Sequence, residues 1–140
     1  MNTSENGFAL IRSNEGLGLK QYLDQGKWAI GYGHDLLPGE TYPNGIDQST
    51  AQKILEKDVA SWDVFINHLA PQANQNQHDA LADFTHQFGP GGLQQLLSHG
   101  WDQVTVQMPR WIHMRNAAGI EVVSPNLVAR RNKEIALFNS

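Results

Sequence analysis

The sequence predicts an α+β fold, in which a small antiparallel β lobe and a larger helical lobe are joined by a long helix. A helical pattern opens the chain, a glycine-rich segment with strand-like spacing follows, and helical periodicity covers most of the rest. One helix, a small sheet and then several helices is an order typical of α+β domains. With 140 residues the chain can bury a core, and we expect one domain, residues 1–140.

The first helix is expected over about residues 4–14. Thr3 or Ser4 can cap its N-terminus, and apolar residues recur on one side of it. Glu15 then stands at its C-terminal end, where the glycines that follow stop the helix.

A small antiparallel sheet of two or three strands is expected within a β lobe of about residues 16–47. Apolar and aromatic residues are spaced there for short strands, and single glycines, Pro-Gly and Asn-Gly mark the turns. Asp24 falls in one of these hairpins, beside the turn residue Gly26.

The linking helix is expected over about residues 48–69. Asp47, Ser49 or Thr50 can cap it, apolar residues recur at three- and four-residue spacing, and a proline ends it. Asp58 falls on the apolar face of this helix.

The remainder is expected to be helical and to complete a helical lobe made of residues 1–15 and 70–140. A Gly-Pro-Gly-Gly break separates two of these helices, and Pro109 is expected to kink a third. The last helix begins at Pro125, a good first-turn residue. These expected helices cover about residues 76–88, 93–99, 102–113 and 125–138.

Composition excludes several classes of function. The chain has no cysteine, which rules out a disulfide scaffold, a thiolate zinc site and a cysteine nucleophile. Its net charge of −4 gives no support for nucleic-acid binding, which leaves a basic footprint. Six histidines occur without a His-Glu-x-x-His motif or a close pair on one helix face, so we expect neither a metal nor another cofactor.

Two acids, Glu15 and Asp24, have the features of a general acid and its charged partner. A helix C-terminus disfavours negative charge and partial burial adds to this, so Glu15 has the surroundings that a general acid needs. Asp24 lies among turn residues in a more solvated place and should stay ionised. Cleavage of a glycosidic bond uses such a pair, because one carboxyl protonates the leaving oxygen while the other stabilises positive charge or directs water. On spacing alone, two solvated surface acids are the commoner explanation.

The stretch EGLGLKQYLDQGKWAIGYGH, residues 15–34, resembles the signature of the phage-type lysozymes, the endolysins of the T-even and lambdoid phages. That signature has Glu-Gly, then Leu, Tyr and Asp, a turn, and Ile-Gly-Tyr/Ile-Gly-His. The likeness continues in GIDQSTAQKILEKDV, QNQHDALADFTHQFGPGGLQQLL and PNLVARRNKEIALF. The resemblance implies a lysozyme-like fold and a muramidase, which hydrolyses the β-1,4 bond between N-acetylmuramic acid and N-acetylglucosamine of peptidoglycan in a cleft between the lobes.

The resemblance also implies roles by position. Glu15 would be the general acid, and Asp24 would stabilise the cation-like transition state or orient water. Because the T-even enzymes invert the anomeric centre, the carboxyl groups of Glu15 and Asp24 are by analogy expected roughly 6.5–9.5 Å apart, which leaves room for a water. His34 and Asp58 would form a structural ion pair between sheet and helix, and one of Arg130 and Arg131, with Arg130 the favoured choice, would approach Glu15.

Three further residues are expected to bind substrate, by the same resemblance. The Ile-Gly-Tyr-Gly-His run frames the cleft with Tyr32 and Gly33, and Gln87 matches a cleft glutamine that can hydrogen-bond an acetamido sugar. Without the resemblance, a glutamine on a helix is usually just solvated and an arginine such as Arg130 is as often a surface residue.

The chain departs from the family at Ala29, where the signature has Thr, sometimes Cys, to help hold the attacking water. Alanine has no hydroxyl, and no Ser or Thr lies between Asp24 and Ile30 to replace it. Three outcomes stay open. The enzyme could hydrolyse at a reduced rate, it could be a lytic transglycosylase in which the 6-hydroxyl of muramic acid attacks, or it could bind peptidoglycan without cleaving it, as a wall-binding or phage structural module.

The expected setting of the protein also follows from these points. No apolar run of signal-peptide or membrane-span length occurs, so we expect a soluble chain without stable membrane insertion. The resemblance implies host lysis by a monomer that waits in the host cytoplasm and reaches the peptidoglycan through a holin-like pore.

Overall fold

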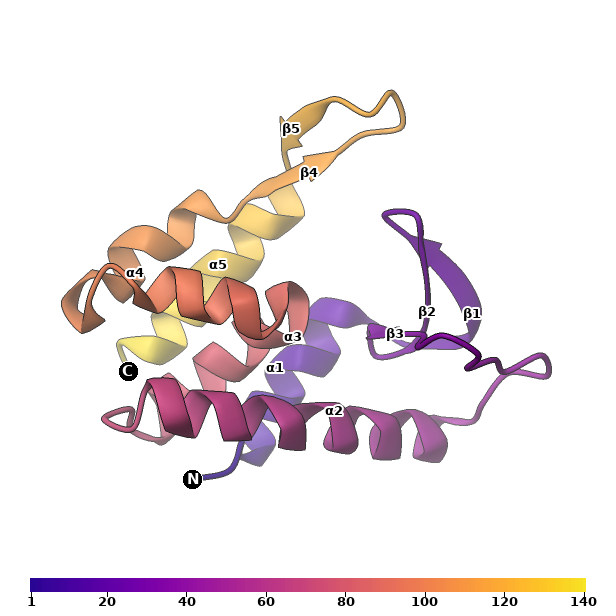
Figure 1. The fold of residues 1–140 in the computed structure, drawn as a ribbon, viewed down its shortest axis with the longest axis horizontal. Coiled ribbons are helices and arrows are strands. Elements are labelled where there is room, and N and C mark those ends of the chain that lie inside the picture. The colour runs from indigo at the N-terminus through magenta and orange to yellow at the C-terminus, as the bar shows by residue number, and fades with distance from the viewer.

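A computed structural model describes residues 1–140 and shows a small sheet beside a larger group of helices (Figure 1). The helices are α1 (Glu5–Glu15), α2 (Gln48–Leu69), α3 (Gln75–Leu97), α4 (Val104–Gln107) and α5 (Pro125–Phe138). The strands are β1 (Gly18–Asp24), β2 (Lys27–Gly31), β3 (His34–Asp35), β4 (His113–Arg115) and β5 (Glu121–Val123). The predicted α+β class is confirmed.

Strands β1, β2 and β3 form an antiparallel sheet in that order, as predicted for this segment. Asp24 at the end of β1 pairs with Lys27 at the start of β2, across a two-residue turn. Both turn residues, Gln25 and Gly26, have positive φ, at 52° and 80°, which matches the twist of a tight hairpin. The turn therefore places Asp24 and Lys27 side by side at the tip of the sheet.

Helix α2 is the predicted linking helix, and it runs beneath both the sheet and the other helices in Figure 1. Asp47 caps it by accepting a hydrogen bond from the backbone N–H of Thr50 at 2.7 Å. The helix ends at Leu69, and Pro71 follows directly after the C-cap residue Ala70. Because α2 contacts β2, β3 and α3, it fixes the sheet relative to the rest of the molecule.

Helix α3 contains the predicted break, but the two helical segments follow each other without a loop. Asn74 and Gln77 form a capping box at its N-terminus. Gly89 has φ 74° and ψ 177°, which interrupts the helix, and Pro90 immediately starts the next turn. The second segment ends at Leu97, slightly earlier than predicted.

The single helix predicted over about residues 102–113 is wrong. The structure has a 3₁₀ turn at Trp101–Gln103, the short α4, a second 3₁₀ turn at Met108–Arg110, and then β4. Pro109 lacks the N–H that a continuous helix would need. The helix therefore narrows to a 3₁₀ turn and ends at that turn.

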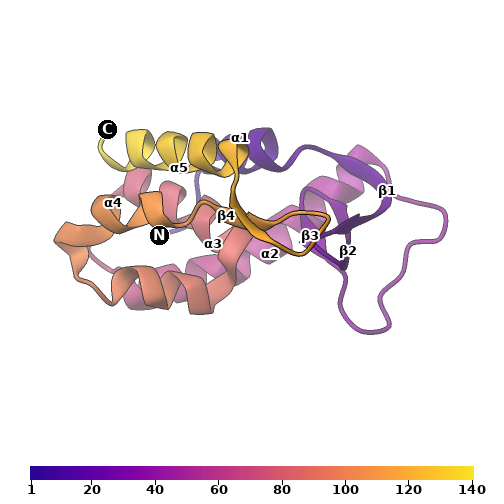
Figure 2. The same cartoon turned by 90° about the horizontal axis from the view of Figure 1, so that it is seen from above.

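Strands β4 and β5 form a hairpin that the sequence did not predict. His113 pairs with Val123 and Arg115 with Glu121. The turn between them is closed by Asn116, whose Oδ1 accepts hydrogen bonds from the N–H of Ala118 and Ile120 at 3.0 and 3.1 Å. The hairpin projects from the helices toward the first sheet in both views (Figures 1 and 2).

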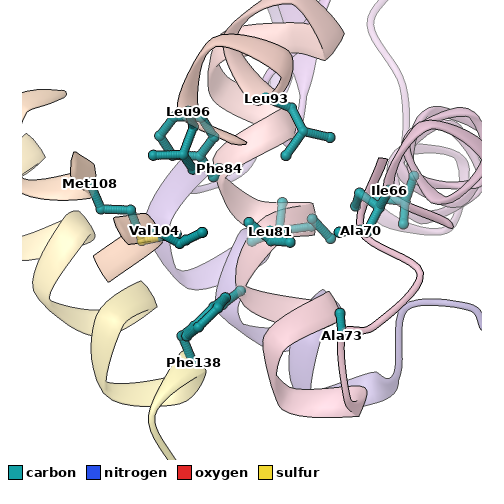
Figure 3. Packing of buried hydrophobic residues seen from close by; sticks show 14 of the residues in the cluster. Ile66, Ala70, Ala73, Leu81, Phe84, Leu93, Leu96, Val104, Met108 and Phe138 are labelled. Atoms are coloured by element: carbon teal, nitrogen blue, oxygen red, sulfur yellow. The ribbon is translucent and has the colours of Figure 1, made fainter. Parts of the chain in front are cut away.

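The hydrophobic core lies in the helical part and centres on α3. Figure 3 shows Leu81, Phe84, Leu93 and Leu96 of α3 meeting side chains from α2 on one side and from the α4 and α5 region on the other. These four side chains are fully buried. Helix α3 therefore holds α2 and α5 in place.

Candidate active site

A cavity of about 420 Å³, here called the cleft, lies between the first sheet and the helices. It is lined from α1, the first sheet, α3, the β4–β5 hairpin and α5 by Glu15, Asp24, Gln25, Lys27, Gly33, Asp35, His86, Gln87, Phe88, His113, Met114, Ser124, Asn126, Leu127 and Arg130. Most of these side chains are polar or charged. The structure thus brings five of the residues predicted from the sequence to one cavity: Glu15, Asp24, Gly33, Gln87 and Arg130.

Glu15 is the last residue of α1, and its side chain is 15% exposed. Its Oε1 accepts a hydrogen bond from Nη1 of Arg130 at 2.7 Å, which is the contact expected for that arginine. Gly33, with φ 72°, lies directly against the Glu15 carboxyl group, and any Cβ at this position would collide with it. Glycine is therefore needed at position 33 for both its backbone conformation and its size.

Arg130 is held by more than Glu15. Its Nε and Nη2 donate to the two carboxylate oxygens of Asp83 at 3.0 and 2.9 Å, in a bidentate pair that is almost completely buried. Burial lowers the pKa of Arg130, but the charges of Asp83 and Glu15 outweigh it and raise the pKa above its usual value. Arg130 therefore stays charged. The pair with Asp83 fixes the direction in which its remaining nitrogen, Nη1, points.

Asp24 occupies the exposed tip of the β1–β2 hairpin, opposite Lys27, and both residues face the cleft. This solvated position agrees with the expectation for Asp24. Tyr22, two residues earlier on the same strand, is half-buried. Burial raises the pKa of Tyr22, and the nearby charges of Glu15 and Asp24 raise it further. The phenol group thus lies near both acids, although the sequence analysis gave Tyr22 no role.

Ala29 does not line the cleft. It is fully buried, and in the sheet it pairs with Tyr22 on β1 and with Asp35 on β3. One hydroxyl does reach the cleft from a residue distant in sequence, since Ser124 lines it. The Oγ of Ser124 already accepts a hydrogen bond from the N–H of Leu127, as the cap of α5.

His34 makes the expected contact with Asp58, with Nδ1 and Oδ2 2.7 Å apart. A second acid, Glu40, which the sequence analysis missed, lies 2.9 Å from Nε2. The hydrogen bond to Asp58 raises the pKa of His34, burial opposes this, and Glu40 adds to the rise, so that the pKa reaches about 9. The imidazole is therefore charged at neutral pH and links β3 to α2.

Gln87 lines the cleft, but its Oε1 is already occupied, because it accepts a hydrogen bond from Nη2 of Arg131 at 2.7 Å. Its amide N–H₂ is the group that it can offer to a ligand.

The substrate-binding role predicted for Tyr32 does not agree with where its side chain lies. The side chain is buried, and it borders a separate groove of about 600 Å³ between α1 and α2. Its hydroxyl accepts a hydrogen bond from Gln48 at 3.5 Å. The backbone of Tyr32 does contact a residue of the cleft lining, because its carbonyl oxygen accepts a hydrogen bond from Nε2 of His86 at 2.7 Å. Tyr32 and Gly33 form the turn between β2 and β3, in which the Tyr32 ring lies toward α2 and Gly33 lies against Glu15.

Several residues around the cleft were not predicted. They come from elements far apart in sequence: His86 and Asp83 from α3, His113 and Met114 from the unpredicted hairpin, and Glu134 from α5. The doublet Arg130–Arg131 on a helix that also carries Glu134 was the one available signal, because buried arginines need acidic partners.

Two structural observations bear on other kinds of site. No group of three or more His, Asp or Glu side chains comes together in a way that could hold a metal ion. None of the helices combines the length and the apolar character needed to cross a membrane.

The amino-acid sequence matches one family of known proteins. Residues 12–134 match the model of the phage lysozyme family. The endolysin of Acyrthosiphon pisum secondary endosymbiont phage 1 is 31% identical over 150 residues, covering 100% of this chain and 99% of that protein. The endolysin of Bacillus phage PZA is 35% identical over 153 residues, and the chain spans about half of it, 56%.

A solved structure agrees with the fold. The muramidase domain of SpmX from Asticaccaulis excentricus superimposes with a TM-score of 0.83 at 28% sequence identity, covering 99% of this chain and 98% of that one. The lysozyme-like fold expected from the resemblance is thus confirmed. With a family match over most of its length and a full-length likeness to a phage endolysin, the chain belongs to the phage lysozyme family.

Proposed function

We propose that this protein is a muramidase that hydrolyses the β-1,4 bond between N-acetylmuramic acid and N-acetylglucosamine in peptidoglycan. One observation carries the proposal: Glu15 and Asp24 line the same cleft, from a helix end and from a hairpin tip. The matched structure named as a muramidase domain supports the same reaction for this fold.

Glu15 is the proposed general acid. In this role its carboxyl group gives a proton to the glycosidic oxygen of the bound sugar. As the proton moves to the glycosidic oxygen, a carboxylate forms beside Arg130, whose Nη1 lies 2.7 Å from Oε1. The guanidinium stabilises that carboxylate, which assists release of the proton.

Asp24 is the proposed charged partner. It lies at the solvated hairpin tip beside Lys27, and a carboxylate at this edge of the cleft can stabilise the positive charge that develops on the sugar ring. In the inverting reaction it also directs a water molecule, which needs the two carboxyl groups roughly 6.5–9.5 Å apart.

A lytic transglycosylase is the second candidate, and the hydroxyl content of the cleft lining favours it. Ser124 supplies the one hydroxyl of the lining, and its Oγ already caps α5, while Ala29 lies buried outside the lining. A reaction in which the 6-hydroxyl of muramic acid attacks needs no bound water. Its product ends in a 1,6-anhydro sugar, whereas hydrolysis leaves a reducing end.

The test is digestion of purified Gram-negative peptidoglycan by the wild type and by Glu15→Gln. The variant is expected to lose activity by about 10²- to 10⁴-fold, the usual contribution of a general acid. Glu5→Gln is the matched control, because Glu5 lies on the same helix, is exposed and is far from the cleft lining.

Mass spectrometry of the released fragments then identifies the reaction. Reducing ends support hydrolysis, and anhydro ends support transglycosylation. Equal digestion by the wild type and Glu15→Gln would reject a catalytic role for Glu15, and binding without any digestion would point to a wall-binding module.

The proposal includes the cellular setting of a phage endolysin. The protein would accumulate in the host cytoplasm as a monomer and reach peptidoglycan through a holin-like pore. Expression in host cells with and without a co-expressed pore protein tests this step. Lysis only in the presence of the pore is the expected result, and lysis without it would contradict the dependence.

A further inference from the structure

Next to Glu15 lies a buried group of charged side chains, of which the proposed reaction uses only Arg130 directly. It consists of Asp83 on α3 with Arg130, Arg131 and Glu134 on α5. Asp83 and Glu134 have no exposed side-chain surface. Glu15 borders this group through its contact with Arg130.

One oxygen in the group has no hydrogen-bonding partner if Glu134 is a carboxylate. Oε1 of Glu134 accepts from Nη2 of Arg131 at 2.7 Å, but Oε2 is fully buried without a donor. A carboxylate oxygen can only accept, and a neighbouring carboxylate offers nothing to accept from. A protonated Oε2 becomes a donor, for which Asp83 is the adjacent acceptor.

The pKa of Glu134 is raised and that of Asp83 is lowered, as expected for two acids that share one proton. Burial raises the pKa of Glu134 well above its usual range, and the hydrogen bond and charge of Asp83 raise it further, against the opposing effect of Arg131. Burial also raises the pKa of Asp83, but the hydrogen bond from Glu134 and the charge of Arg130 outweigh it, so this pKa is lowered. Both directions agree with a protonated Glu134 beside an ionised Asp83.

We propose that Glu134, in its protonated form, is a positioning residue for Glu15, acting through Asp83 and Arg130. Its O–H donates to the Asp83 carboxylate. That carboxylate grips Nε and Nη2 of Arg130, and because the guanidinium is planar and rigid, this grip sets the direction in which Nη1 meets Glu15. Ionisation of Glu134 would place two adjacent carboxylates in the interior and loosen this chain of contacts.

This inference rests on the proposed function only for its activity readout, since the protonation of Glu134 can be measured separately. Infrared spectroscopy of the folded wild type at neutral pH is expected to show the C=O stretch of a protonated, buried carboxyl group. The band should disappear in Glu134→Gln and persist in Glu15→Gln. Persistence of the band in Glu134→Gln, or its absence from the wild type, would overturn the inference whether or not the protein is an enzyme.

The activity test compares Glu134→Gln with Glu134→Ala on soluble peptidoglycan fragments. An amide reproduces the protonated carboxyl group, because it donates to Asp83 and accepts from Arg131. Glu134→Gln is therefore expected to fold and to keep kcat within about twofold of the wild type. Glu134→Ala is expected to lower kcat on the order of ten- to a hundredfold, with little change in KM, because misplacing a catalytic group slows the chemical step.

The results separate the possible explanations. If Glu134→Gln fails to fold, or loses as much kcat as Glu134→Ala, the ionised form is the one required and the inference is wrong. If Glu134→Ala does not fold, the Gln variant and the infrared band still decide. If Glu15→Gln is fully active while the infrared result holds, the proposed function fails and the protonation of Glu134 stands.

Discussion

At the scale of single residues, the contacts of Ala29, His34 and Gly33 explain the motif over residues 15–34 better than their sequence spacing does. His34 holds the sheet to α2 through Asp58, and Gly33 leaves room for the Glu15 carboxyl group. Ala29 packs in the interior of the sheet. The motif therefore combines a site with the framework that positions it.

Adding a hydroxyl at position 29 tests the meaning of this departure from the family. Ala29→Thr inserts atoms at a fully buried position, and we expect it to destabilise the fold by about 1–3 kcal/mol through overpacking, without increasing the yield of reducing ends. Thermal denaturation and fragment analysis measure both effects. Ala117→Thr, at an exposed position, is the control. A gain in hydrolysis with unchanged stability would show that position 29 reaches the attacking water after all.

The contacts of His34 with Asp58 and Glu40 predict that the stability of the protein depends on pH. The pKa of His34 is about 9 in the folded protein and about 6.5 in the unfolded chain. Its contribution to stability is therefore fully present below pH 6.5 and disappears as the pH rises through 9. The shift corresponds to an effect on the order of 3 kcal/mol.

Denaturant unfolding of the wild type between pH 6 and 10, compared with Asp58→Asn, measures that contribution. The variant should be less stable at pH 6, and its disadvantage should shrink toward pH 10. His68→Gln, at an exposed histidine on α2, serves as the control. An equal disadvantage for Asp58→Asn at both ends of the range would contradict the assignment.

At the scale of elements, the β4–β5 hairpin is the part of the cleft wall that sequence periodicity failed to predict. Its strands have three residues each, and they are largely exposed, so no apolar alternation marks them. The hairpin nevertheless brings His113 and Met114 to the cleft. We expect these side chains to contact the sugar chain and to add little to stability.

Replacing His113 and Met114 together by serine tests that role. KM for soluble peptidoglycan fragments is expected to rise severalfold, while the free energy of unfolding stays within about 0.5 kcal/mol of the wild type, as for most surface substitutions. Ile120→Ser is the matched control, because Ile120 lies on the same hairpin, is 60% exposed and does not line the cleft. Unchanged KM in the double variant, or an equal rise in the control, would remove the hairpin from substrate binding.

At the scale of the whole molecule, three long-range contacts hold the fold together: two join the region of the first sheet to the helices, and one joins α1 to α5. They are the His34–Asp58 pair, the hydrogen bond from His86 to the Tyr32 carbonyl, and the Glu15–Arg130 pair. Each joins elements that are distant in sequence. We therefore expect residues 1–140 to unfold as one cooperative domain.

Scanning calorimetry measures this cooperativity. A single transition is expected, with equal calorimetric and van't Hoff enthalpies of about 100 kcal/mol for a chain of 140 residues. Two resolved transitions would show that the sheet and the helices unfold separately, and that the three contacts do not couple them.

The sequence by itself determined what depends on neighbours along the chain. The helix that ends at Glu15, the tight turn after Asp24, the capped linking helix and the proline that starts α5 all follow from local caps, turns and periodicity. Local patterns also placed the two acids beside turns, and the family resemblance supplied Arg130 and the His34–Asp58 pair.

Only the tertiary structure decided which side chains meet. The Tyr32 ring lies toward α2 while its neighbour Gly33 lies against Glu15 at the end of α1, so two adjacent residues contact different helices. Arg130 reaches Glu15 across 115 positions of sequence, while Asp83 holds Arg130 from α3 and Glu134 pairs with Arg131 within α5. Local propensity fixes the helices and turns, but burial forces charged groups to find partners, and those partners are chosen by packing between elements that no short stretch of sequence contains.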